Sequence, residues 1–223
     1  ERVDNFEVTV DNSYKIATRF SKFHNLPELT SVLSEIADFH QVDEEEAGLP
    51  AFNGYTDILI PRSKELSMYI DQISERADKI HSGKISNKED NMLALTGDGR
   101  RAALEIRLVM PEAPYTYDCK IARCVENVSK IYRENMDKKS TQIVFCDISV
   151  PKPDEFNVYD ELKFRLIEAG IPANEIELIH GGCPEEKRSE IFRAVNKGYI
   201  RVVVGSTNLL GVGVNVQEKL IAV

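Results

Sequence analysis

The sequence predicts an α/β protein in which a parallel sheet flanked by helices follows a mainly helical extension. Two observations support this prediction. Short runs of β-branched and apolar residues, such as RVVVG at 201–205, alternate with amphipathic helical segments throughout residues 141–223. Further upstream, apolar residues recur at helical spacing between residues 54 and 137. A chain of 223 residues is long enough to bury a complete α/β core.

Strands and helices of the C-terminal part follow one another in regular order. We expect strands at 141–149, 176–180, 201–205 and 219–223, with helices at 157–170 and 184–198. Gly170 is suited to end the first helix, Pro184 to occupy the first position of the second, and Gly198 to end it. Strands connected in this way form a parallel sheet with right-handed crossovers.

The rest of the chain divides into two further parts. Residues 1–53 are expected to be an arm with a strand at 6–10, a helix at 26–39 and an acidic break at 43–46. This arm has too few apolar residues for a core of its own and reads as the remainder of a preceding domain. Residues 54–137 form the helical linker, and residues 138–223 form the sheet domain.

Within the linker, one strand and three helices are predicted. The strand covers residues 55–60, and Ser63 caps a helix that ends at Gly83. A second helix is expected over residues 99–108. The third helix has a buried stripe made of Ile121, Cys124, Val125, Val128 and Ile131. We interpret these apolar stripes as packing surfaces and not as a cofactor site.

The run RVVVGSTNLLGVGVNVQ at 201–217 carries the clearest functional signal. Its strand leads to Ser206 and Thr207, and then to a turn containing Gly211, Gly213 and Asn215. Hydroxyls and a glycine-rich backbone form a cradle for oxyanions, because no Cβ shields the N–H groups. An ordinary strand and turn of an α/β sheet would have the same residues, so this run alone does not decide between the two interpretations.

Several segments together resemble the second RecA-like lobe of superfamily-two helicases. The run at 201–217 resembles motif V, in the form found in Snf-type DNA translocases, and TQIVFCDIS at 141–149 resembles motif IV. The resemblance covers residues 141–223 and includes Ile-His-Gly at 179–181 and Arg188. Residues 90–109 are similar to a segment of very large helicases from bacterial mobile elements and phages. The beginning of the chain resembles the segment between the two motor lobes of those proteins.

Those large helicases often carry an adenine-specific DNA methyltransferase region in the same polypeptide. This chain contains no NPPY-type tetrapeptide and no glycine-rich cofactor loop. Any methylation activity of a parent protein is therefore expected to lie outside residues 1–223.

The resemblance implies roles for individual residues. Ser206 and Thr207 would hold a phosphate of the DNA strand, with support from the turn after Phe145 and from a DNA-proximal loop at His180 and Gly181. A second set of residues would face the nucleotide: Gly211, Gly213, Asn215 and Gln217. Arg188 would pair with a carboxylate inside the lobe or reach a phosphate, and we favour the structural role. Asn208 departs from the family, which often has Arg there, and this removes one phosphate contact.

Motifs absent from the sequence limit the expected activity. It contains no GxxxxGK[ST] loop and no DExx-type acid pair, and motif VI with its arginine fingers would lie beyond Val223. We therefore expect half of a split active site, with no catalytic residue in this fragment and no ATP hydrolysis by it alone. ATP and Mg²⁺ belong to the full-length motor, and none is expected to bind the fragment. DNA and the missing first RecA-like lobe are the implied partners.

The formal net charge of −9 predicts weak DNA binding by this part alone. Local basic groups exist at Arg100-Arg101 with Arg107, at Lys138-Lys139 and at Lys187-Arg188 with Arg193; we interpret the second as a solvated surface. No apolar run is long enough to span a bilayer and no signal peptide is present, so we expect a cytoplasmic protein without a membrane partner. The four cysteines and four histidines lack ligand spacing, which predicts reduced thiols and no metal site.

Two other functions are compatible with the sequence. A Rossmann-like enzyme that binds a nucleotide or nucleotide sugar would use GSTNLLGVG at 205–213 as its phosphate turn. It would need a complete pocket at the C-terminal edge of the sheet. Alternatively, the chain is a protein-interaction module, which an exposed apolar patch on the helical part would favour.

Overall fold

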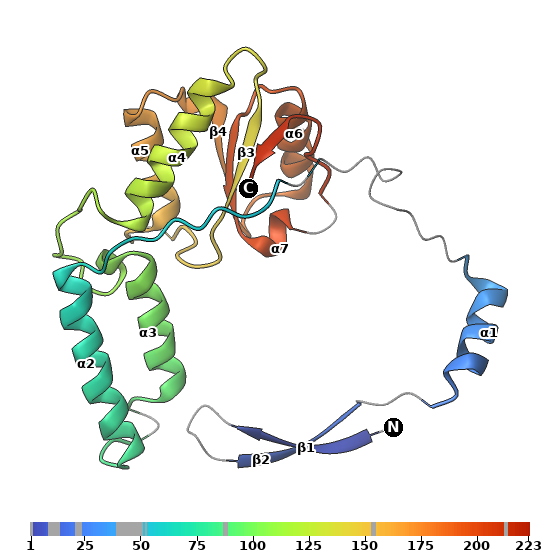
Figure 1. Ribbon diagram of the computed structural model, residues 1–223, viewed down its shortest axis with the longest axis vertical. Coiled ribbons are helices and arrows are strands. Elements are labelled where there is room, and N and C mark those ends of the chain that lie inside the picture. Colours follow the sequence, from blue (N-terminus) through green and yellow to red (C-terminus); the bar gives the residue numbers. More distant parts are fainter. Residues whose placement is uncertain are drawn as a thin grey trace. The chain divides into compact units, whose positions relative to one another are not determined.

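The computed structural model describes residues 2–8, 14–20, 24–38, 51, 53–86, 89–152, 155–211 and 214–223 (Figure 1). It contains two compact units. One consists of Glu1–Leu49 with Ser74–Thr96, and the other of Pro50–Ile73 with Gly97–Val223. Among the described residues, no helix combines the length and apolar character needed to cross a membrane.

A four-stranded parallel sheet forms the centre of the second unit. Its spatial order is β4-β5-β3-β6. The strands are β3 (Thr141–Phe145), β4 (Ile176–Ile179), β5 (Val202–Gly205) and β6 (Leu220–Ala222). Each lies within a run predicted to be a strand, and the α/β fold with a RecA-like parallel sheet is confirmed.

Helices cover both faces of this sheet (Figure 1). They are α4 (Lys120–Glu134), α5 (Val158–Glu168), α6 (Glu185–Asn196) and the short α7 (Thr207–Leu210), with a 3₁₀ turn at Ala173–Glu175 before β4. Val203 packs in one cluster with Ile191 and Val195 of α6, whereas Val202 and Val204 pack in the clusters that contain α4 and α5. Because successive strand residues point to opposite faces, a strand covered on both sides must be apolar throughout.

Turn residues at the helix ends behave largely as the sequence predicts. The side chain of Asn157 caps α5 by accepting a hydrogen bond from the backbone N–H of Asp160 at 2.9 Å. Gly170 and Gly198 follow α5 and α6 with φ values of 95° and 73°. A Cβ on Gly198 would stand 2.7 Å from the carbonyl oxygen of Lys139, so only glycine fits there. Pro184 is the N-cap of α6, one residue before the predicted position.

Arg201 attaches the end of α4 to the sheet. This arginine is buried and its guanidinium donates hydrogen bonds to the carbonyls of Ser140 at 3.0 Å, Tyr132 at 3.2 Å and Asn135 at 3.0 Å. It also stacks over the Tyr132 ring at 4.0 Å. A buried cation is tolerated when several acceptors surround it, so Arg201 fixes the connection between α4 and β3.

The helical extension differs from its prediction at two places. Helix α2 (Lys64–His81) begins after Ser63, whose hydroxyl accepts from the Leu66 N–H at 3.1 Å, and Gly83 follows its end as expected. The predicted strand at 55–60 is wrong: these residues form no strand and most are exposed, because no sheet edge pairs with them. The helix predicted at 99–108 is in fact α3 (Met92–Leu104) followed by a separate 3₁₀ turn at Ile106–Leu108.

Near the N-terminus, β1 (Arg2–Val8) pairs with β2 (Tyr14–Phe20) in an antiparallel hairpin. The strand predicted at 6–10 overlaps β1, with residues 9 and 10 outside the described part, while β2 was not predicted. Helix α1 (Leu26–Ile36) lies within the helix predicted at 26–39, and none of its residues is buried. The acidic break at 43–46 lies outside the described residues.

Candidate nucleic-acid interface

The predicted DNA-binding residues follow three neighbouring strands of the sheet. In the register of the sheet, Gly205 of β5 pairs with Phe145 of β3 on one side and Ile179 of β4 on the other. Ser206 and His180 come directly after β5 and β4. Since the strands are parallel, Phe145, Ser206 and His180 lie at one C-terminal edge, where ligands bind in open α/β sheets.

Gly205 allows a close turn from β5 into α7. A Cβ at this position would lie 2.5 Å from Cδ1 of Leu210, which is buried in the core beneath the turn. The carbonyl of Ser206 accepts from the N–H groups of Leu209 and Leu210, both at 3.0 Å. Its hydroxyl makes no hydrogen bond with any described residue. The backbone of the turn is thereby fixed while the Ser206 hydroxyl stays available to a ligand.

Thr207 is held by a carboxylate that sequence reasoning did not single out. Asp147, two residues beyond the end of β3, accepts from the Thr207 N–H at 2.7 Å and from its hydroxyl at 2.9 Å. An N–H and an O–H converging on one anion is the arrangement that a phosphate oxygen would also use. The predicted phosphate donor is therefore bonded internally in this conformation. Asp147 lies in the polar exit of the motif IV run, which was the only signal for it.

His180 and Gly181 begin the loop between β4 and α6. His180 is half-buried, and its carbonyl accepts from the Cys183 N–H at 2.9 Å. Its Nδ1 accepts a longer bond of 3.4 Å from the Gly182 N–H. Gly181 is exposed. The loop thus lies at the same edge as Ser206, with one imidazole and an open backbone segment.

The residues predicted to face nucleotide lie between α7 and β6. Gly211 ends α7 and is exposed; a Cβ there would stand 2.5 Å from the Thr207 carbonyl oxygen. Asn215 is exposed, and its carbonyl accepts from the side-chain amide of Asn196 on α6 at 2.9 Å. Gln217 is half-buried. Gly213 lies outside the described residues.

Arg188 lies in the first half of α6. It forms no ion pair with any described residue, so the carboxylate partner that we favoured is not found in that part of the chain. Its Nε is buried without a hydrogen-bond partner. An unpaired buried donor of this kind costs free energy, and an acceptor from outside would remove that cost.

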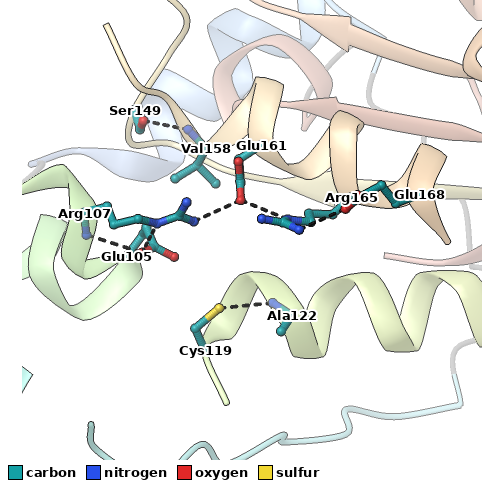
Figure 2. A network of polar contacts seen from close by, with 9 residues as sticks. All are labelled: Glu105, Arg107, Cys119, Ala122, Ser149, Val158, Glu161, Arg165 and Glu168. Atoms are coloured by element: carbon teal, nitrogen blue, oxygen red, sulfur yellow. Dashed lines mark hydrogen bonds and ion pairs between the residues drawn. The ribbon is translucent and has the colours of Figure 1, made fainter. Parts of the chain in front are cut away.

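An ionic network connects the 3₁₀ turn after α3 to α5 (Figure 2). Arg107 donates to Glu105 at 2.9 Å and to Glu161 at 3.1 Å, and Glu161 also accepts from Arg165 at 3.0 Å. Burial alone would lower the pKa of Arg107, but the two carboxylates outweigh burial and raise it. The guanidinium therefore stays charged and rigidly held.

Beside this network lies a cavity of about 700 Å³. It is bounded by the C-terminal half of α3, by the 3₁₀ turn and by the loop that follows β3. Its lining includes the basic residues Arg100, Arg101, Arg107 and Lys152 and the aromatic residue Phe156. The sequence showed Arg100, Arg101 and Arg107 as a local basic run, but gave no sign that a loop about fifty residues later closes over them.

The four cysteines are described as thiols. All four cysteines are free, and burial raises the pKa of Cys124 to about 11 and that of Cys146 above its usual value. In the described part of the chain, no group of three or more His, Cys, Asp or Glu residues is placed to hold a metal ion.

Comparison with known proteins finds a similarity within the sheet domain. Residues 123–220 match the model of the helicase conserved C-terminal domain. This segment is thus similar to the C-terminal domain of helicases. The match begins within α4 and ends at the first residue of β6, and it contains the whole edge described above. No curated protein and no solved structure matches the chain. Since helicase domains in general interact with nucleic acid, the C-terminal edge of this lobe is a candidate nucleic-acid interface.

Proposed function

We propose that the chain supplies the second RecA-like lobe of an ATP-driven, Snf-type DNA translocase, of the large bacterial mobile-element or phage kind often fused to an adenine-specific methyltransferase. The observation that carries this proposal is that the runs resembling motifs IV and V end at one edge of a sheet whose segment 123–220 is similar to the helicase conserved C-terminal domain. In such a motor, ATP binding closes two lobes and hydrolysis reopens them. We propose that the motor acts in the cytoplasm, and that ATP and Mg²⁺ bind to the complete motor.

The division of the chain follows from the same proposal. Residues 1–53 are the arm from the preceding motor lobe, residues 54–137 the helical linker, and residues 138–223 the lobe itself. The chain alone lacks the phosphate-binding loop and the arginine fingers, so it does not hydrolyse ATP by itself.

Ser206 and Thr207 are the proposed phosphate grip of this lobe. Ser206 offers a hydroxyl without a described partner, and the Thr207 N–H and hydroxyl now bond to Asp147. We propose that a strand phosphate takes the place of the Asp147 carboxylate, accepting the same two donors. When a phosphate replaces the carboxylate, the N–H and the hydroxyl of Thr207 both keep a hydrogen-bond acceptor, so neither donor is left unpaired. The buried Nε of Arg188 is a further donor for an acceptor from outside the lobe.

The test compares single substitutions in a polypeptide that joins this chain to a first motor lobe. Thr207→Ala removes a bond to a charged group, typically about 1.5–3 kcal/mol, and weakens DNA-stimulated ATPase more than nucleotide binding. Asn215→Ala does the reverse, impairing nucleotide-dependent closure while sparing DNA affinity without ATP. Asp147→Asn removes the competing charge and raises DNA affinity. Asn208→Ala is the matched control, being exposed on α7 beside Thr207.

Paired titrations of DNA and of an ATP analogue on each variant separate the outcomes. Parallel loss of both affinities in Thr207→Ala and Asn215→Ala, together with a lower melting temperature, would mean that the turn is only structural. No change in either variant would mean that motif V has been assigned to the wrong residues. A fall in DNA affinity in Asp147→Asn would contradict the proposal that a strand phosphate replaces the Asp147 carboxylate.

A nucleotide-binding enzyme of the Rossmann-like class is the second candidate, because a 700 Å³ cavity is lined by the loop that follows β3; the predicted phosphate turn at 205–213 contributes no residue to this lining. Such an enzyme would bind a free nucleotide without a partner lobe. The competition experiment below distinguishes this candidate from a strand-binding lobe.

A further inference from the structure

The cavity beside the loop after β3 has positive charge on two of its sides. Arg100 and Arg101 come from α3, and Lys152 comes from the loop. Arg101 forms an ion pair with Asp98 in its own helix, and Lys152 contacts Glu155 at 3.4 Å. Arg100 makes no ion pair with a described residue. The Arg101 and Lys152 side chains are 50% and 68% exposed, so both pairs are open to exchange with a stronger anion.

Arg107 has a different role in the same cavity. Its guanidinium is engaged by both Glu105 and Glu161, and so it contributes little net charge to a ligand. Instead it lies 4.5 Å from the centre of the Phe156 ring and holds that ring in place. Ser149 further fixes the loop by accepting from the Val158 N–H at 2.9 Å (Figure 2). The loop segment that carries Phe156 is therefore held in place by its contact with Arg107 of the ionic network.

Phe156 gives the cavity an aromatic surface. The ring lines the cavity and is 40% exposed, although one cation already contacts it. Leu108, Pro111 and Val150 extend this apolar lining. An exposed aromatic ring beside basic side chains is the combination by which proteins bind unpaired nucleotides, with bases stacked on rings and phosphates held by cations.

We infer that this cavity binds an unstacked nucleotide of a single nucleic-acid strand, outside the motif V grip. The base lies against Phe156, and the flanking phosphates meet Arg100, Arg101 and Lys152. A volume of about 700 Å³ is within the range of pockets that hold small ligands. Exposed cations from two separate segments, α3 and the loop, suit a backbone that passes through the mouth better than a single enclosed phosphate. The inference extends the proposed function, because it gives the lobe a second contact on the same strand.

The experiment measures binding of the 223-residue chain to a short fluorescein-labelled oligothymidylate by fluorescence anisotropy over a series of salt concentrations. Arg100→Ala/Arg101→Ala lowers affinity about tenfold or more and reduces the slope of log K against log salt by about 1.4, because each single-strand phosphate contact contributes about 0.7. Phe156→Leu also lowers affinity about tenfold, by loss of stacking, but leaves the slope unchanged. Phe156→Trp retains the affinity.

Lys130→Ala/Arg133→Ala is the matched control, since it also removes two exposed cations from a helix, α4. It leaves both affinity and salt slope close to those of the unsubstituted chain. Melting curves from circular dichroism confirm that each variant is folded. An equal effect of the control pair and the Arg100/Arg101 pair would overturn the inference, as would the absence of oligothymidylate binding at low salt.

Thymidine monophosphate serves as a competitor and separates the two sources of a nucleotide. Competition only at far higher concentration than unlabelled oligothymidylate supports a strand site. Competition at equal concentration, lost in Arg100→Ala/Arg101→Ala, overturns the strand assignment in favour of a free-nucleotide site. Thr207→Ala is titrated in parallel. If Thr207→Ala binds normally while the cavity variants do not, the inferred cavity contact is supported and the proposed phosphate grip is contradicted. If Thr207→Ala loses affinity while the cavity variants bind normally, the phosphate grip is supported and the cavity contact is contradicted.

Discussion

Helices α1 and α5 are equal in length and similar in pattern, but only one of them is packed. Each has 11 residues with apolar side chains along one face. Four residues of α5 are buried against α4 and the sheet, whereas no residue of α1 is buried. An amphipathic pattern thus predicts a helix without naming its partner. The apolar face of α1 fits the interpretation of the N-terminal part as an arm, which stays a prediction.

The largest expected difference comes from matched truncations in these two helices. Leu166 of α5 is 1% exposed and packs with Val128, Tyr132 and Ile176, while Leu29 of α1 is 45% exposed. Leu166→Ala lowers the free energy of unfolding by about 2–5 kcal/mol through lost burial and the cavity left behind. Leu29→Ala leaves it nearly unchanged. Urea unfolding followed by circular dichroism measures both, and a comparable loss in the two variants would show that α1 has a packed partner.

Buried and exposed ion pairs give the next comparison. Arg107 bonds to Glu105, which is 3% exposed, so Arg107→Ala leaves a buried carboxylate unpaired and costs about 3–5 kcal/mol. Arg123 pairs with Asp118 and Glu126 at the surface, and Arg123→Ala causes no measurable change.

The double variant Arg107→Met/Glu105→Met distinguishes charge from packing. It removes both members of the pair and is expected to be more stable than Arg107→Ala, since no charge is left alone. Urea unfolding midpoints of the three variants are compared. If the double variant is the least stable, the Glu105 side chain contributes more than its ion pair, and its capping bond from the Arg107 N–H at 3.3 Å would be the first candidate.

Local signals in the sequence were enough for most of the second unit. Continuous β-branched runs predicted β3 and β5, and Gly170 and Gly198 predicted helix ends, because each depends on the backbone of a few neighbouring residues. The strand at 55–60 failed for the opposite reason: its composition suits a strand, but a strand also needs an edge to pair with. Likewise, β2 had no signal that distinguished it from a loop.

In the candidate site, too, some features could be predicted from the sequence and others could not. Ser206, Thr207, Phe145 and His180 could be placed at one edge, because parallel strands bring their C-terminal ends together. The bonds from Thr207 to Asp147 could not be predicted, since they join residues sixty positions apart. The cavity that contains Arg101 and Phe156 depends in the same way on a long-range approach of two segments.

The smallest expected effect concerns two asparagines at helix N-caps. Asn157 caps α5 with its side-chain oxygen, which accepts from the Asp160 N–H at 2.9 Å. Asn25 precedes α1 with φ of 52° and makes no such capping bond. Asn157→Ala therefore lowers the free energy of unfolding by about 1 kcal/mol, and Asn157→Ser, which keeps an acceptor, restores most of it.

Asn25→Gly is expected to leave stability unchanged, because the left-handed backbone at this position costs glycine nothing and no cap is lost. Urea unfolding of all three variants, with helix content from circular dichroism, measures these differences. Equal destabilisation by Asn25→Gly and Asn157→Ala would mean that Asn25 contributes more than its backbone conformation. Its contact from Nδ2 to Glu28 at 3.1 Å would then be the first candidate, since it also crosses the first turn of the helix. In that case α1 would be stabilised locally, and the difference between the packed and unpacked helices would lie in their side-chain burial alone.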